Sequence, residues 1–245
     1  MNIQYCSDLH LELRDPFPSI VPSAPILFLA GDICSLYGKH ILKYYIFLRW
    51  ISKKFERVFI VLGNHEYYHS SIPRAEAIAK RICQVINPDK IILLQCNRYH
   101  LTPKLRVIGC TLWTNPSNPR LWTCMSDFTL IKNFTIRQCI FFHQQHVKFL
   151  EDEMKEAKKD EVDLLVMTHH LPSYQMIHSK FQDHPMNGFF ATGLDRLIQH
   201  PVRLWVCGHS HCVQKKIIQD VAVVMNCLGY PKESTGYQSH ISATI

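Results

Sequence analysis

The chain has 245 residues, of which 47% are hydrophobic and 19% charged, with 10 cysteines and a formal net charge of +7. This hydrophobic share allows a buried core, and no apolar run reaches the roughly 18 residues of a membrane-spanning helix, so a membrane span is excluded. The N-terminus has acidic Asp8 where a signal peptide needs an apolar stretch, which favours a cytoplasmic protein.

The positive charge is spread along the sequence without a long basic block. This pattern indicates a solvated surface more than a dedicated polyanion site, and it also suits phosphorylated substrates. Several cysteines, such as Cys6 and Cys207, fall inside strand-like runs. Irregular spacing and the absence of an export signal predict buried, reduced thiols.

The first half of the sequence predicts apolar strands that alternate with helices. A short strand, IQYC, precedes a Pro-rich loop at 15–25, and a buried strand, ILFLA, then stops at Gly31. Residues 38–54 predict a helix and RVFIVLG a buried strand, and Pro73 begins a helix that reaches about Ile86. KIILL, YHL and LRVIGCTLW predict further strands.

The second half continues the alternation around two irregular stretches, 114–134 and 171–192. Between them we expect a long amphipathic helix, with apolar side chains at near-helical intervals at Ile136, Ile140, Val147, Leu150 and Met154. The strand DLLVMT ends at His169, a short helix lies near 193–199, and RLWVC and VAVVMN are the last strands. Buried strands that alternate with helices predict an α/β class.

Metal-competent side chains follow five of these apolar runs. They are Asp8 and His10, then Asp32, then Asn64 and His65, then His169 and His170, and finally His209 and His211. Ligands in α/β sheets gather at the carboxyl ends of strands, so we expect these side chains to converge. In extended chain, residues two apart point the same way, which lets Asp8 act with His10 and His209 with His211.

The donor set mixes hard oxygen with imidazole nitrogen. Such a set suits manganese, iron or zinc better than magnesium or calcium. It contains more ligands than one tetrahedral ion can use, so it predicts two divalent metal ions that share a bridging carboxylate. We expect the glycines at 31, 63 and 208 to let the backbone turn sharply at the sheet edge.

The blocks DLH, GD, GNHE, a histidine after a strand, and GHSH occur in this order over residues 8–211. This pattern resembles the calcineurin-like metallophosphoesterases. TLWT, THHLPS and NCLGYPKE are also similar to a bacterial-type branch whose substrates are mostly unassigned. The resemblance implies a four-layer α/β/β/α sandwich: two mixed sheets with helices on both outer faces. We expect one domain over 1–245, with rim loops at about 114–134 and 171–192.

The resemblance also implies the site. Asp8, His10 and His211 would hold one metal, Asn64, His169 and His209 the other, with Asp32 between them and His65 protonating or stabilising the leaving oxygen. A metal-activated hydroxide would attack phosphorus. Glu66 would orient a neighbouring ligand or basic side chain. His170 follows His169 directly, faces away from it in extended chain, and is a candidate substrate contact.

The substrate is left open between a phosphorylated small molecule and a nucleotide or nucleic-acid fragment. Protein phosphatases of this superfamily carry an arginine soon after GD, whereas this chain continues GDICSLYG. A phosphodiester or nucleotide-type substrate is therefore slightly favoured. Aromatic side chains in the rim loops, such as Trp122 and Phe181, either stack a base or pack the loops.

Two alternatives remain. HEYYH, residues 65–69, fits a zinc-peptidase pattern, which needs His65 and His69 one turn apart on a helix with Glu66 as base. The preceding VFIVLGN predicts strand and turn instead. The other alternative is a non-catalytic protein-binding scaffold, but such chains tend to lose ligands that this chain keeps. We expect the remaining histidines on surfaces or in loops: His40, His69, His100, His143, His146, His178, His184, His200 and His240.

Overall fold

A computed structural model describes residues 1–245 and contains two β-sheets. The first sheet has the strand order β11-β1-β2-β3-β4. Its parallel strands are β1 (Asn2–Cys6), β2 (Ile26–Ala30), β3 (Arg57–Val61) and β4 (Ile91–Leu93). The edge strand β11 (Ser242–Thr244) pairs antiparallel with β1.

The second sheet has the order β5-β6-β7-β8-β10-β9. Its parallel centre consists of β6 (Leu105–Cys110), β7 (Asp163–Thr168), β8 (Val202–Cys207) and β10 (Val221–Asn226). The antiparallel edges are β5 (Asn97–Thr102) and β9 (Val213–Ile218). Each sheet therefore brings several parallel carboxyl ends to one edge, where polar loop residues can meet.

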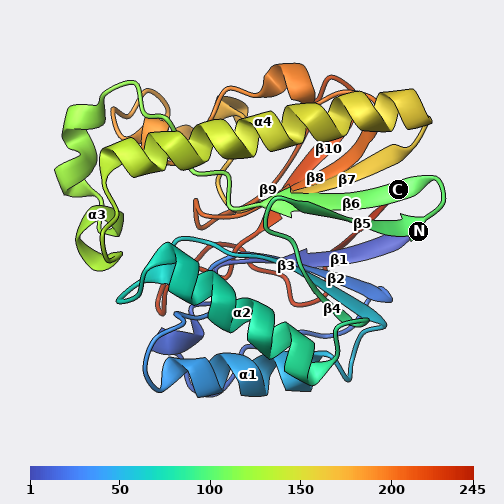
Figure 1. The fold of residues 1–245 in the computed structure, drawn as a ribbon, viewed down its shortest axis with the longest axis horizontal. Coiled ribbons are helices and arrows are strands. Elements are labelled where there is room, and N and C mark those ends of the chain that lie inside the picture. Colours follow the sequence, from blue (N-terminus) through green and yellow to red (C-terminus); the bar gives the residue numbers. More distant parts are fainter.

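Helices cover the outer face of each sheet, as the sequence resemblance implied (Figure 1). Helices α1 (His40–Ile51) and α2 (Ile72–Ile86) lie on the first sheet, and the long α4 (Ile136–Asp160) lies on the second. The short α3 (Asp127–Leu130) precedes α4. No helix of this chain combines the length and apolar character that a membrane crossing requires.

Alternating side chains explain why both faces of each sheet are buried. In β2, Phe28 packs between the sheets, whereas Leu27 and Leu29 join the core under α1 and α2. In β7, Leu165 faces the first sheet and Val166 the core under α4. Because side chains alternate along a strand, an unbroken apolar run fills two cores at once.

The structure corrects several element predictions. VAVVMN does not end the sheets, because β9 precedes it as a hairpin partner and β11 follows it. Half of the β9 residues are exposed and only Ile218 is buried, so this edge strand lacks the apolar alternation of a half-buried strand. β6 stops at Cys110, before the predicted Trp113. The expected helix near 193–199 is only a 3₁₀ turn, Asp195–Leu197.

The thiol prediction also needs correction. All ten cysteines are free, and most are buried as expected, but Cys96 and Cys124 are exposed. Both lie in irregular or edge segments, where no strand pattern in the sequence predicted burial.

Candidate dinuclear metal site

The predicted ligands lie where the carboxyl edges of the two sheets meet. The loops after β1, β2 and β3 of the first sheet carry Asp8, His10, Asp32 and Asn64. The loops after β7 and β8 of the second sheet carry His169, His209 and His211. Neither sheet alone therefore contains a complete set of ligands.

One group of side chains combines both sheets around Asp8. The Nε2 atoms of His10 and His211 are 3.0 Å apart, and Asp8 Oδ1 is 3.4 Å from His211 Nε2. All three side chains offer ligand atoms within 4.8 Å of one another. Asp8 and His10 are fully buried, so their lone pairs are directed into the protein rather than to solvent.

A second group forms around His169. Its Nε2 lies 3.1 Å from Asn64 Oδ1 and 3.2 Å from His209 Nδ1. The Asn64 amide turns its oxygen toward this group because its Nδ2 donates to Asp127 Oδ1 (2.8 Å) and to the Tyr68 hydroxyl (3.0 Å). The amide is thus oriented as an oxygen ligand, the form that a divalent cation requires.

Asp32 lies between the two groups. Its Oδ2 is 3.9 Å from His10 Nε2 in the first group and 3.5 Å from His169 Nε2 in the second. Its Oδ1 is already used, because it accepts the backbone N–H of His65 at 2.8 Å. One carboxylate oxygen is therefore left to face both groups.

Three of the four histidines predicted as ligands have a partner on the nitrogen that faces away from the site. His10 Nδ1 contacts Glu12 (3.2 Å), His211 Nδ1 contacts Glu233 (2.7 Å), and His169 Nδ1 contacts the Ala30 carbonyl (2.9 Å). Such partners hold a proton on the distal nitrogen, so the facing nitrogen becomes the lone-pair donor once it has lost its own proton, as in metal sites. His209 is the exception, because its Nε2 is buried without a partner.

The site chemistry fits divalent cations. Ring nitrogens that face each other at 3.0 and 3.2 Å share at most one proton per pair, whereas a cation between them satisfies both lone pairs. Ligands about 2.1 Å from one ion lie roughly 3–3.5 Å from each other, which matches these spacings. Carboxylate, amide oxygen and imidazole are all donors that divalent cations accept in proteins.

The charges within the site keep its carboxylates ionised. Burial opposes ionisation of Asp8, but the hydrogen bond and charge of His211 lower its pKa to about 2. Burial likewise disfavours a charged His169, but the Asp32 carboxylate raises its pKa to about 10. For His211, burial is outweighed by Asp8 and Glu233, which raise the pKa to about 9. Without a metal, two imidazolium groups therefore balance the carboxylates.

These pKa values predict proton release on metal binding. At pH 7.5, below both values, His169 and His211 are protonated and a metal must displace about two protons. Affinity should therefore rise with pH and fall in acid. Calorimetric titration with Mn²⁺ in buffers of different ionisation enthalpy measures the number released. A release near zero at pH 7.5 would contradict this protonation state.

The ligand loops adopt an unusual backbone. Five of the predicted ligands have positive φ, between 44° and 68°: Asp8, His10, Asp32, His209 and His211. This left-handed region costs non-glycine residues energy and persists where the surrounding structure enforces it, commonly at functional sites. The strain lies on the predicted ligands themselves, so the sharp turns predicted for the glycines are made largely by the residues that follow them.

The glycines serve two different purposes. Gly31 has φ +87°, as a sharp turn requires. Gly63 and Gly208 have no positive φ, so the turn explanation is wrong for them. A Cβ on Gly63 would lie 2.1 Å from Asp32 Oδ1, and one on Gly208 would lie 2.6 Å from Ser7 Oγ. These two positions need glycine because neighbouring loops approach the backbone closely.

His65 lies beside both groups. Its Nδ1 is 3.0 Å from Glu12 Oε1, its Nε2 is 3.0 Å from the Tyr230 hydroxyl, and Nε2 is 3.9 Å from Asp32 Oδ2. Its ring packs on Tyr68 with centroids 4.2 Å apart. Burial is outweighed by the charges of Asp32 and Glu12, which raise the His65 pKa.

Three contributors were missed by the sequence interpretation: Glu12, Tyr230 and Glu233. Glu12 contacts both His10 and His65, and lies two residues after His10 in DLHLEL. That spacing repeats the spacing between Asp8 and His10 and was an available signal. The other two lie in a C-terminal loop with no strand-end pattern.

Glu66 acts differently from the prediction. It orients no ligand side chain, but its carboxylate accepts the backbone N–H groups of Asp32 (3.0 Å), Ile33 (2.7 Å) and Gly63 (2.7 Å). It thereby ties the loop after β2 to the loop after β3 and fixes the backbone that carries Asp32.

The prediction that His170 contacts the substrate is also corrected. It is buried, its Nδ1 contacts the Thr111 carbonyl at 3.1 Å, and its ring lies 4.2 Å from that of His209. His170 therefore packs against the His209 ring, and it is not among the residues that line the cavity above the site. His146, expected on a surface or in a loop, is buried on α4 and accepts the Trp113 N–H at 3.2 Å.

The peptidase geometry is absent from HEYYH. His65–Tyr67 forms a 3₁₀ turn rather than an α-helix. His69 is exposed with φ 62°, packs near Tyr37, and belongs to no group of metal-competent side chains. His65 and His69 therefore do not form the helical pair that a zinc peptidase requires.

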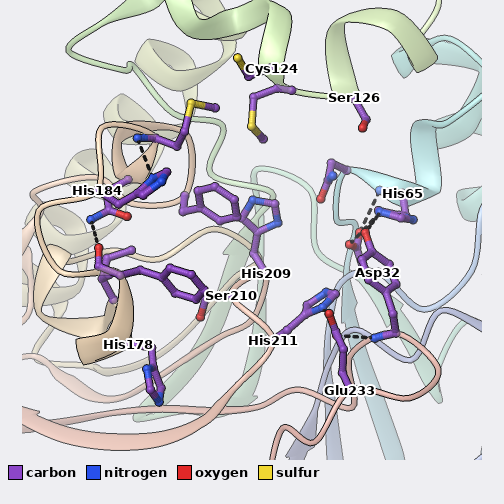
Figure 2. A pocket seen from close by; sticks show the side chains of 18 of the residues that line it. Asp32, His65, Cys124, Ser126, His178, His184, His209, Ser210, His211 and Glu233 are labelled. Atoms are coloured by element: carbon purple, nitrogen blue, oxygen red, sulfur yellow. Dashed lines mark hydrogen bonds and ion pairs between the residues drawn. The ribbon is translucent and has the colours of Figure 1, made fainter.

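A cavity of about 480 Å³ opens above Asp32, Asn64, His65, His209 and His211. Figure 2 shows Asp32, His65, His209 and His211 below Cys124 and Ser126, with His178 and His184 at the left. Residues from 114–134 and 171–192 thus contribute to its walls. Of the aromatic side chains in these two stretches, Phe181 and Phe190 line the cavity, whereas Trp122 is exposed; the neighbouring Trp113 is buried against Phe134.

Comparisons with known proteins show what this chain is similar to. A family model for calcineurin-like phosphoesterases matches residues 1–213. The uncharacterised protein L509 of Acanthamoeba polyphaga mimivirus is 28% identical over 273 residues, 97% of this chain and 94% of that protein.

Two solved structures share the fold. The phosphopantetheinyl hydrolase of Mycobacterium tuberculosis superposes with a TM-score of 0.74 at 16% identity, covering 94% of this chain and 90% of that one. A dimetal phosphatase from Danio rerio gives a TM-score of 0.54 at 11% identity, covering 94% and 87%.

Proposed function

Because this chain belongs to the calcineurin-like phosphoesterase family, we propose that it hydrolyses a phosphoester bond with the help of two divalent metal ions. The observation that carries the proposal is Asp32 Oδ2, which lies 3.9 Å from His10 Nε2 and 3.5 Å from His169 Nε2. A single oxygen that faces two groups of ligands suits a pair of ions and has no role in a one-metal site.

The ligands divide into two sets. Asp8, His10 and His211 would hold one ion, Asn64, His169 and His209 the other, and Asp32 would contact both. When bound, two such ions supply Lewis-acid activation of a water and neutralise charge on the phosphoryl oxygens.

His65 is positioned to act on the leaving oxygen. Glu12 Oε1 holds its Nδ1 at 3.0 Å and thereby directs Nε2 into the cavity. A raised pKa favours the protonated ring, so Nε2–H can be donated to the departing oxygen. Glu12 balances the positive charge before that transfer.

The lining and the volume of the cavity favour a substrate larger than a simple phosphomonoester. Ile177, Phe181 and Phe190 line it, and no lysine or arginine does. Its size lies within the range of small-molecule sites, about 300–1,000 Å³. An apolar wall without cations suits an organic group on the phosphate better than additional charge, so a phosphodiester or nucleotide-type substrate is favoured.

A panel assay tests the proposal. Protein loaded with Mn²⁺, Fe²⁺ or Zn²⁺ is offered phosphomonoesters, phosphodiesters, cyclic nucleotides and short single strands. We expect hydrolysis that a chelator abolishes and added metal restores, with diesters that carry an aromatic or nucleoside group faster than small monoesters. Hydrolysis of none of them with any metal would instead support the scaffold alternative.

A further inference from the structure

The C-terminal segment Leu228–Glu233 lies beyond residues 1–213, the part that the family model matches, yet it returns to the site. The Leu228 N–H donates to the Ser7 carbonyl and the Gly229 N–H to the Asp8 carbonyl, each at 3.0 Å. The segment is thus bonded to the backbone of a predicted ligand. The side chains of this segment therefore have a fixed position relative to the first group of predicted ligands, the group around Asp8.

Glu233 fixes the next residue. Its Oε2 accepts the Tyr230 N–H at 2.7 Å and contacts His211 Nδ1, also at 2.7 Å. Gly229 makes this turn possible, since it has φ +76° and a Cβ there would lie 2.5 Å from Glu233 Oε2. Figure 2 shows Glu233 beside His211 at the edge of the cavity. One carboxylate therefore positions both a ligand and the backbone of Tyr230.

The Tyr230 side chain covers the first group of ligands. Its ring centroid is 4.5 Å from that of His10 and 4.5 Å from that of His211, and its hydroxyl is 3.0 Å from His65 Nε2. The side chain lines the cavity, and 37% of the residue remains exposed. The hydroxyl thus lies at the cavity surface, between the first group of ligands and His65.

We propose that Tyr230 is a catalytic residue whose hydroxyl hydrogen-bonds an oxygen of the bound phosphoryl group beside His10 and His211. The inference rests on the proposed function. Since no lysine or arginine lines the cavity, contacts to the phosphoryl group beyond the metals must come from neutral donors or histidine. A phenol both donates and accepts, so the hydroxyl that contacts His65 in the free site can donate to the phosphoryl oxygen when the His65 Nε2–H is donated to the leaving oxygen.

Tyr230→Phe tests the proposal, because it keeps the ring on His10 and His211 and removes only the hydroxyl. We expect kcat/KM to fall about 10- to 100-fold, the loss of one hydrogen bond to a charged group. Affinity for inorganic phosphate, measured by calorimetry on the metal-loaded protein, should fall as well. Metal content and Tm should stay unchanged.

Tyr237→Phe is the matched control. It removes a tyrosine hydroxyl that lies shortly after the C-terminal segment and donates to the Ser19 carbonyl at 3.2 Å, so activity should stay unchanged. In a His65→Ala background, Tyr230→Phe should add little further loss, because residues that act as a unit are not additive.

The outcomes separate this inference from the proposed function. Full kcat/KM and full phosphate affinity in Tyr230→Phe would overturn the role of Tyr230 and leave phosphoester hydrolysis intact. Loss of metal would also overturn it, since Tyr230 would then support the ligands rather than the substrate. If the unmodified protein hydrolyses none of the esters, the proposed function fails, and the inference is then tested by phosphate affinity alone. Weaker phosphate binding by Tyr230→Phe than by the unmodified protein would support the inference, and equal binding would overturn it.

Discussion

Asp32→Asn is expected to lower kcat/KM by at least about 10³-fold, because the carboxylate that faces both groups of ligands loses its charge. The substitution preserves size, so the surrounding loops have no steric reason to move. It also places an amide N–H₂ near either the His65 N–H, which Asp32 Oδ1 now accepts at 2.8 Å, or the two ligand groups. In one orientation the side chain loses the hydrogen bond from the His65 N–H, and in the other it no longer presents an oxygen to the two ligand groups.

Steady-state kinetics with elemental analysis of the purified variant measures this effect. Metal content should fall from two ions per chain, since the shared ligand contributes to both sites. Asp220→Asn is the matched control: Asp220 also has positive φ, at 68°, but lies exposed in the turn between β9 and β10. Retention of two ions and full activity in Asp32→Asn would refute the bridging role.

His65→Ala is expected to slow turnover by roughly 10²–10⁴-fold, the usual contribution of a general acid. Metal content should stay near normal, because the hydrogen bond from the His65 backbone N–H to Asp32, at 2.8 Å, is retained in alanine, and the side chain lies only at 3.9 Å from that carboxylate. The lost groups are the ring between Glu12 and Tyr230 and its packing on Tyr68.

The choice of leaving group distinguishes proton donation from a structural effect. A nitrophenyl ester leaves as a stable anion and needs little protonation, so His65→Ala should slow it far less than an alkyl ester. His69→Asn is the control, since His69 is exposed, has φ 62°, and asparagine tolerates that backbone. Full turnover of alkyl esters by His65→Ala would show that the assigned role is wrong.

The sequence predicted the α/β class and the location of polar residues for a simple reason. Strands buried on both faces are unbroken apolar runs, so their ends are visible as the points where polar residues begin. Asp8, Asp32 and His169 each follow such a run. The exposed edge strand β9 gave no comparable contrast and was missed.

The supporting residues could not be predicted in the same way. Glu12, Tyr230 and Glu233 lie in turns and loops, where a carboxylate or a phenol is ordinary. For Tyr230 and Glu233 the importance depends on contacts across more than 20 residues, Tyr230 with His65 and Glu233 with His211, whereas for Glu12 only the two-residue spacing from His10 gave a local signal. Spacing along the chain contains no information about contacts of that kind.

The sequence by itself determined which donor atoms are present and that each follows a strand, because a buried strand is an unbroken apolar run and its end is the point where polar residues begin. Only the tertiary structure decided that Asp8 and His10 come from one sheet and His209 and His211 from the other. It also decided that several ligands adopt left-handed backbone. Both features arise from packing one sheet on another, a long-range balance of buried surface and backbone strain that no local pattern records.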